Sequence, residues 1–198
     1  MSDNLNKISF LIFFFLFAIG IFAQTDSVEY SLNLDFGFGP AKYFSELEYN
    51  DFYGGTPYTF TIRGMWQPEH LLRIGLETGY VPIYFLKTKL YDTVYGDTDV
   101  KLSLSSIPIV AIFSMKTYDY LEIFGGIGGF ILISDVTSFG NRVTNTSWSN
   151  VYEFGMNYLY PVSDKIKIGA ELKSYYILKL ENFDLVFQLM IKYKFYSF

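Results

Sequence analysis

The ionisable side chains that recur at every second position of several segments are the residues of this chain most able to do chemistry. Seven of them stand out: Arg63, Arg73, Glu77, Glu122, Glu171, Lys167 and Lys192. Paired carboxylates can serve acid–base catalysis, and rings of charge can line an ion pathway. Because acids and bases fall on neighbouring segments, we interpret the seven as a structural network of ion pairs. An ion pathway is the alternative.

Residue types suited to nucleophilic catalysis or metal binding are nearly absent. The single histidine, His70, lies in a short turn, and the chain has no cysteine. One histidine and scattered carboxylates do not make a metal site, and without cysteine there is no disulfide. The glycines of Gly125–Gly129 look like a phosphate loop, but no helix follows them. We therefore predict no catalytic residue, no metal, no cofactor and no enzymatic activity.

The charged residues are positioned by segments in which apolar and polar residues alternate. Val28, Tyr30, Leu32, Leu34, Phe36 and Phe38 are apolar, and polar residues or glycine stand between them. Such alternation predicts a strand with one apolar face. Eight segments follow the pattern, at about Val28–Gly39, Tyr58–Trp66, Leu72–Tyr80, Lys101–Met115, Leu121–Ile131, Tyr152–Tyr160, Lys165–Lys173 and Leu185–Phe195. In the fourth segment the parity changes around Pro108, which predicts a β-bulge near Ser106–Pro108.

The segments are joined alternately by long loops and short turns. Long polar loops are predicted up to about Thr56, over Pro82–Val100 and over Ser134–Asn150. Outer-membrane barrels have long extracellular loops and short periplasmic turns. The alternation therefore predicts that both termini are periplasmic.

The N-terminus has the pattern of an export signal. Lys7 precedes an apolar run from Phe10 to Phe22, and Ala23 offers a small residue for cleavage. A helix needs about 20 apolar residues to span a bilayer, so a retained anchor is the weaker alternative. We expect a signal peptide over residues 1–23 and one domain over residues 24–198.

The fold class follows from the number of strands and from the bulk of the two faces. A membrane-spanning chain without a long apolar helix must form a closed barrel, and the interior of an eight-stranded barrel is only wide enough for side chains. The many Tyr and Phe residues of the apolar face therefore point outward, and the polar stripes fill the lumen. The sequence predicts an all-β, eight-stranded, antiparallel up-and-down transmembrane barrel. A soluble barrel with an apolar interior is the alternative.

Partners are predicted from charge and from the loops. The net charge of −5 gives no basic patch for nucleic acid. Exposed aromatic residues mark interaction surfaces, and the first loop is rich in them: Tyr43, Phe44, Tyr49, Phe52 and Tyr53. We expect outer-membrane lipid around the barrel and a protein or glycan partner at the loops, unless the aromatic residues only pack against one another.

Several segments resemble the small outer-membrane β-barrel family of Gram-negative bacteria, with the OmpA/OmpX-like architecture and including PorT-like members. They are LLRIGLETGY (71–80), SSIPIVA (105–111), EIFGGIGGF (122–130), YPVSDKIKIGAEL (160–172) and KYKF (192–195). The resemblance implies the outer membrane of the cell envelope and a terminal aromatic insertion signal, either Phe195 or Phe198. The family has no catalytic residues to carry over, and we expect a non-enzymatic, structural or surface-interaction role. A component of a protein export system, as in PorT-like members, and a narrow channel are the alternatives.

Overall fold

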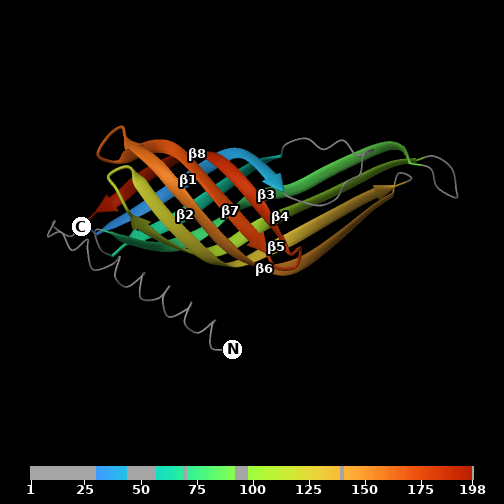
Figure 1. Ribbon diagram of the computed structural model, residues 1–198, viewed down its shortest axis with the longest axis horizontal. Helices are drawn as coiled ribbons and strands as arrows, with labels where there is room; N and C mark the ends of the chain where they lie inside the picture. The colour runs from blue at the N-terminus through green and yellow to red at the C-terminus, as the bar shows by residue number, and fades with distance from the viewer. Residues whose placement is uncertain (1–29, 44–56, 69–70, 92–97, 139–140, 198) are drawn as a thin grey trace, which may run out of the picture.

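The computed structural model describes residues 30–43, 57–68, 71–91, 98–138 and 141–197. Eight antiparallel strands form a closed barrel in which each strand pairs with its neighbours in the chain and β1 pairs with β8 (Figure 1). The strands are β1 (Ser31–Tyr43), β2 (Tyr58–Gln67), β3 (Leu72–Tyr91), β4 (Thr98–Lys116), β5 (Leu121–Ser138), β6 (Asn141–Pro161), β7 (Ile166–Ile177) and β8 (Asn182–Ser197). The predicted eight-stranded up-and-down barrel is confirmed. The expected signal peptide lies outside the described residues.

The two faces of each strand differ as the alternation requires. Arg63, Glu77 and Gln188 point into the barrel and are 0–2% exposed, whereas outward-facing Leu76 and Leu189 are 64% and 67% exposed. Successive side chains of a strand point to opposite faces, so the register that buries one polar residue buries every second residue. In the described part of the chain no helix is long and apolar enough to cross a membrane.

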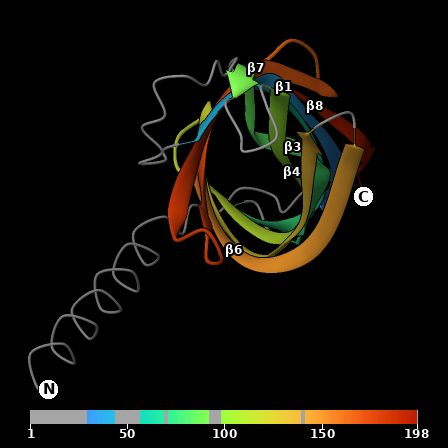
Figure 2. The ribbon, with the colours of Figure 1, turned by 90° about the vertical axis from the view of Figure 1, so that its right-hand side faces the viewer.

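Two long hairpins project from one end of the barrel (Figure 1), the end that faces the viewer in Figure 2. The β3–β4 ladder continues to Tyr91↔Thr98, and the β5–β6 ladder continues to Ser138↔Asn141. The segments predicted as loops over 82–100 and 134–150 are therefore largely strand, and that prediction is wrong. Next to the barrel the inner face of these hairpins is apolar, at Ile83, Leu104 and Leu132. Farther out, along Asn141–Thr146, both faces are exposed, and strand pairing continues there without an apolar face.

We call residues 82–91, 98–106, 132–138 and 141–150 the four-stranded extension, because β4 also pairs with β5 along it. The end of the barrel that carries it is the hairpin end. The opposite end, where Tyr118–Tyr120 and Val162–Lys165 turn the chain, is the short-turn end.

The irregularity predicted in β4 lies in its neighbour instead. β4 pairs with β5 without a break from Lys101↔Thr137 to Lys116↔Glu122, so the predicted bulge at Ser106–Pro108 is wrong. The register shifts in β3, between Pro82 and Tyr84. Between Thr78↔Ile109 and Val81↔Ser106 no β3–β4 residues pair, so Pro108 can lie there although it has no N–H to donate.

The lumen is filled in two different ways. An apolar core closes the half nearer the hairpin end, and it includes Val81, Ile83, Leu104, Phe130, Leu132, Val151, Tyr175, Ile177 and Val186. Ionic side chains fill the half nearer the short-turn end. The prediction of a polar lumen is therefore correct for one half only. A change of parity around Pro108 would turn Leu104 outward, but Leu104 faces inward, because inward and outward side chains alternate without a break along β4.

Candidate functional site: ion-pair clusters inside the barrel

Five charged side chains meet at the centre of the lumen, and we call them the central cluster: Arg63, Glu77, Glu153, Glu171 and Lys173. The Arg63 guanidinium donates from Nε to Glu77, from Nη1 to Glu171 at 2.5 Å and from Nη2 to Glu153 at 3.2 Å. Lys173 Nζ donates to both oxygens of Glu77, at 2.8 and 3.0 Å. Two cations thus hold three carboxylates, and all five side chains are at most 2% exposed.

The register of the strands places these groups against one another. Arg63 lies directly opposite Glu77 in the β2–β3 ladder, whereas Glu153 and Lys173 come from β6 and β7 on another part of the wall. The centroid of the Phe124 ring on β5 lies 4.3 Å from the Arg63 guanidinium carbon, so the cation also contacts an aromatic face. The Tyr175 hydroxyl donates to Glu77 and joins the cluster to the apolar core.

A second cluster, which we call the lower cluster, lies nearer the short-turn end. Glu122 accepts hydrogen bonds from Arg73 Nη1 and from Lys192 Nζ, both at 2.6 Å. Lys192 Nζ also lies 3.6 Å from an Asp35 oxygen. Two cations and two carboxylates therefore compensate one another here.

The structure brings together most of the network residues expected from the sequence, but in two groups. Arg63, Glu77 and Glu171 lie in the central cluster, and Arg73, Glu122 and Lys192 lie in the lower cluster. Lys167 points into the same lumen but has no ion pair within 4.0 Å among the described residues.

The inward parity of Glu153 and Lys173 also predicts that both side chains point into the lumen with the other charges, but it does not show which groups they contact. No sequence pattern predicts Tyr175 there, because an isolated tyrosine fits either face of a strand.

The aromatic residues of the first loop are only partly described. Phe44, Tyr49, Phe52 and Tyr53 lie outside the described residues, as does His70. Tyr43 ends β1, and its ring packs 6.1 Å from that of Tyr84 over the apolar core. This contact gives Tyr43 a packing role at the hairpin end.

The geometry of the clusters is that of a packed interior. A buried charge is tolerated when it is paired and hydrogen-bonded, and these charges contact one another more closely than a permeating ion would allow. Among the described residues no group of three or more His, Cys, Asp or Glu side chains could hold a metal. The arrangement can therefore fix strand positions across the lumen.

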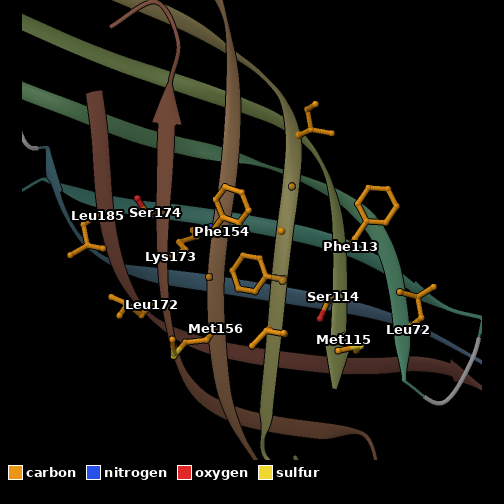
Figure 3. Close-up of a pocket in the computed structure, with 16 residues that line it drawn as sticks. Leu72, Phe113, Ser114, Met115, Phe154, Met156, Leu172, Lys173, Ser174 and Leu185 are labelled. Atoms are coloured by element: carbon orange, nitrogen blue, oxygen red, sulfur yellow. The ribbon is translucent and has the colours of Figure 1, made fainter. Parts of the chain in front are cut away.

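The outer wall of the barrel carries an apolar hollow of about 850 Å³ (Figure 3). Gly125 lies between Phe113 and Phe154 in the strand registers, and its missing side chain leaves space between the two rings. Lys173 contributes to the lining, but its ammonium is buried with Glu77 inside the barrel. The hollow thus offers an apolar surface and no reactive group.

Known structures share the architecture, although no family model and no curated protein matches the chain. Ail, the attachment invasion locus protein of Yersinia pestis, aligns over 86% of this chain and 100% of its own, with 15% identity and a TM-score of 0.51. A major outer membrane protein from Thermus thermophilus aligns over 84% and 99%, with 12% identity and a TM-score of 0.49. OprG from Pseudomonas aeruginosa aligns over 86% and 97%, with 11% identity and a TM-score of 0.46. The closed ring of eight strands and the likeness to Ail show that the chain has the OmpA/OmpX-like fold, the small closed eight-stranded barrel of outer-membrane proteins.

Proposed function

We propose that the protein is an integral outer-membrane barrel whose lumen is filled and whose four-stranded extension binds a partner at the cell surface. The observation that carries the membrane location is the outer wall. Its exposed side chains are predominantly large and apolar, among them Phe113, Phe154, Leu76 and Leu189, each more than half exposed. Exposed apolar patches of soluble proteins rarely exceed a few hundred Å², whereas lipid covers such a belt in outer-membrane barrels.

The short turns and the long hairpins support one orientation in that membrane. The short-turn end would face the periplasm, together with both termini, and the hairpin end would face the outside. Export by the signal peptide of residues 1–23 is part of this proposal. Aromatic side chains near the short-turn end, such as Tyr120, Tyr158 and Tyr160, pack together as an interfacial girdle would.

The filled lumen supports a structural or binding role over a narrow channel. Ion pairs occupy one half of the lumen and apolar side chains close the other half. An eight-stranded barrel has no further width for water. Binding would therefore take place on the part of the protein that projects from the membrane, because the segments that connect the strands of a rigid scaffold often carry its binding residues.

The extension offers an open strand edge for such binding. β6 pairs with β7 from Val151↔Ile177 onward, and Asn150 still accepts a backbone hydrogen bond from Leu178. Among the described residues, the stretch from Asn141 to Trp148 pairs on one side only, with β5. Val143 and Trp148 on this edge are 66% and 54% exposed. Unpaired edges accept an added strand from another protein, and exposed aromatic rings also suit a glycan.

Single cysteines test the location and the orientation. Cysteine at Asn145 should react with an impermeant maleimide on intact cells, and cysteine at Asp164 should react only after the outer membrane is opened. Reaction of the Asp164→Cys variant on intact cells would contradict the orientation. Absence of both variants from the outer-membrane fraction would contradict the location.

A shortened hairpin tests the binding role. Joining Ile133 to Thr146 through Asn-Gly keeps the Ile133↔Thr146 pair and removes the outer part of the β5–β6 hairpin. The variant should insert and keep its heat-modifiable gel shift but lose crosslinking to surface partners. A variant with Thr137→Ser is the matched control. Unchanged crosslinking in the shortened variant would refute the binding role of this hairpin.

A further inference from the structure

The outer part of β6 is an open sheet edge without the features that usually protect one. Along Asn141–Trp148 β6 pairs with β5 and, among the described residues, with no strand on its other side. Sheet edges are commonly protected by lysine, proline or a bulge. This stretch contains no lysine and no proline, and its ladder with β5 runs without a bulge. Its one charged side chain, Arg142, is already bound to Asp135 at 2.8 Å.

The opposite edge of the four-stranded extension has a different sequence. Within the described residues β2 pairs with β3 only up to Tyr80, so the rest of β3 forms that edge. It contains Pro82, Lys87 and Lys89, which are residue types that discourage the addition of a strand. Of the two edges of this sheet, the β6 edge is therefore the one suited to pair with another strand.

The backbone groups that an added strand would meet follow from the ladder. The carbonyl of Asn150 accepts a hydrogen bond from Leu178 N at 3.1 Å, on the side of β6 that faces β7. Backbone groups of alternate residues in an antiparallel strand point to the same side. The residues that direct their N–H and C=O groups to the open side are therefore Arg142, Thr144, Thr146 and Trp148. Because β7 ends before this edge begins, an added strand can lie in line with β7.

The side chains of this edge are complementary to those of a second copy. When two such edges pair antiparallel about a two-fold axis at Asn145, Thr144 lies opposite Thr146 and Arg142 lies opposite Trp148 of the second copy. Paired threonines stabilise a ladder, and an arginine over a tryptophan ring forms a cation–π contact. The Trp148 side chain is 54% exposed, so its ring is accessible. Like charges do not meet, because the single ionisable residue of the stretch faces a tryptophan.

We propose that the protein joins two facing outer membranes by pairing its β6 edge with the β6 edge of a second copy. Antiparallel strands run in opposite directions, so the two barrels lie at opposite ends of the joined sheet and their membranes face each other. One short pair of edges binds weakly, but many copies on two surfaces bind together with much higher avidity. The inference rests on the proposed function, since it names the partner of the extension and needs the hairpin end to face outward.

Disulfide trapping tests the register, and the chain has no cysteine of its own. Opposite residues that are not hydrogen-bonded to each other lie about 4.5 Å apart at Cα, which a disulfide can bridge. Position 145 lies opposite itself in the proposed pairing, so Asn145→Cys in phosphatidylcholine vesicles should form linked dimers on oxidation. Val143→Cys alone should not, but it should link to Ser147→Cys. Mixing vesicles that carry one of these two variants with vesicles that carry the other places the link between membranes.

Vesicle clustering, measured by light scattering, tests the binding itself. Phosphatidylcholine vesicles that contain the parent protein should cluster. Thr146→Pro should abolish the clustering, because it removes an N–H from the open edge and no hydrogen bond to β5. Thr146→Val keeps the N–H and is the matched control, which should cluster vesicles as the parent protein does. Gel shifts before and after heating establish that all variants are folded.

Self-pairing and the proposed binding role can fail separately. Self-pairing is overturned if parent vesicles do not cluster, if Thr146→Pro clusters them equally well, or if Asn145→Cys forms no more linked dimers than Val143→Cys alone. If Thr146→Pro then still removes crosslinking to surface partners on cells, the edge binds a strand of another protein, and the proposed function stands. If cells show no crosslinked partner either, the proposed function is overturned as well.

Discussion

Replacing Arg63 by methionine should destabilise the barrel more than replacing any one of the carboxylates around it. Arg63 donates to Glu77, to Glu171 and to Glu153, and its side chain is 2% exposed. Without it, Lys173 alone faces three buried carboxylates. Removing one partner of a buried ion pair typically costs about 3–5 kcal/mol, because the other charge stays buried and uncompensated.

The expected effect of Glu77→Gln shows why the loss of Arg63 should lower the free energy of unfolding by more. The amide keeps the volume of Glu77 and leaves two cations facing two carboxylates, so no net charge is stranded. Lys173 keeps Glu171 at 3.2 Å, and Arg63 keeps Glu171 at 2.5 Å. The loss is then limited to weakened hydrogen bonds, about 1–3 kcal/mol. Arg63→Met should therefore cost more than Glu77→Gln.

Urea unfolding in lipid vesicles, followed by tryptophan fluorescence, measures the two free energies. Arg142→Met on the extension is the control for loss of an arginine, and since that side chain is 67% exposed, the unfolding midpoint should not change. A Glu77→Gln loss equal to or larger than that of Arg63→Met would refute the charge count of the central cluster. Unchanged midpoints for both variants would show that the cluster contributes nothing to stability.

Three further predictions concern the wall, the lumen and the extension. Leu76→Arg, at an exposed site midway between Leu72 and Tyr80 of β3, should lower the free energy of unfolding by about 2–4 kcal/mol if this residue faces lipid, whereas Val143→Arg on the extension should leave it unchanged; equal effects would contradict the assignment. Gly37→Val should cost about 1–3 kcal/mol by overpacking the lumen, because a side chain there meets Gln188 and Thr61, and an unchanged urea midpoint would refute this. Hydrogen bonds from Arg142 and Thr144 lower the pKa of Asp135, so this ion pair should persist at mildly acidic pH and be lost only as the pH falls through the lowered pKa. An NMR titration should show the midpoint rising in Arg142→Gln, and no rise would exclude Arg142 as the cause.

The positions of the strands and the faces of most of them were predictable from the sequence. Alternation is a local property, since successive residues of a strand point to opposite sides. The polar side chain of Glu77 therefore indicates the inward face, and the apolar side chain of its neighbour Leu76 indicates the outward face, without knowledge of the strands that pair with them. The number of strands then limited the width of the lumen and assigned the polar face to it.

The extent of the strands was harder to predict. Along Asn141–Thr146 in the outer part of the extension, the side chains of both faces are exposed, so these mostly polar residues fit a loop or a strand equally well. Pairing with a neighbouring strand decides between the two, and the neighbour is not part of the local pattern. Pairing also decides the faces of β4. Its unbroken ladder with β5 keeps inward and outward side chains alternating along the whole strand, and Pro108 does not change this alternation.

The grouping of the charges was decided by the tertiary structure alone. The sequence by itself determined that Arg63, Glu171 and Lys167 share the inward face. Closure of the barrel set the stagger between strands, and this stagger placed Glu171 against Arg63 but left Lys167 opposite Lys192. Contacts across a lumen join residues as far apart in sequence as 63 and 171, and their distance depends on the register of every ladder between them, which no local pattern encodes.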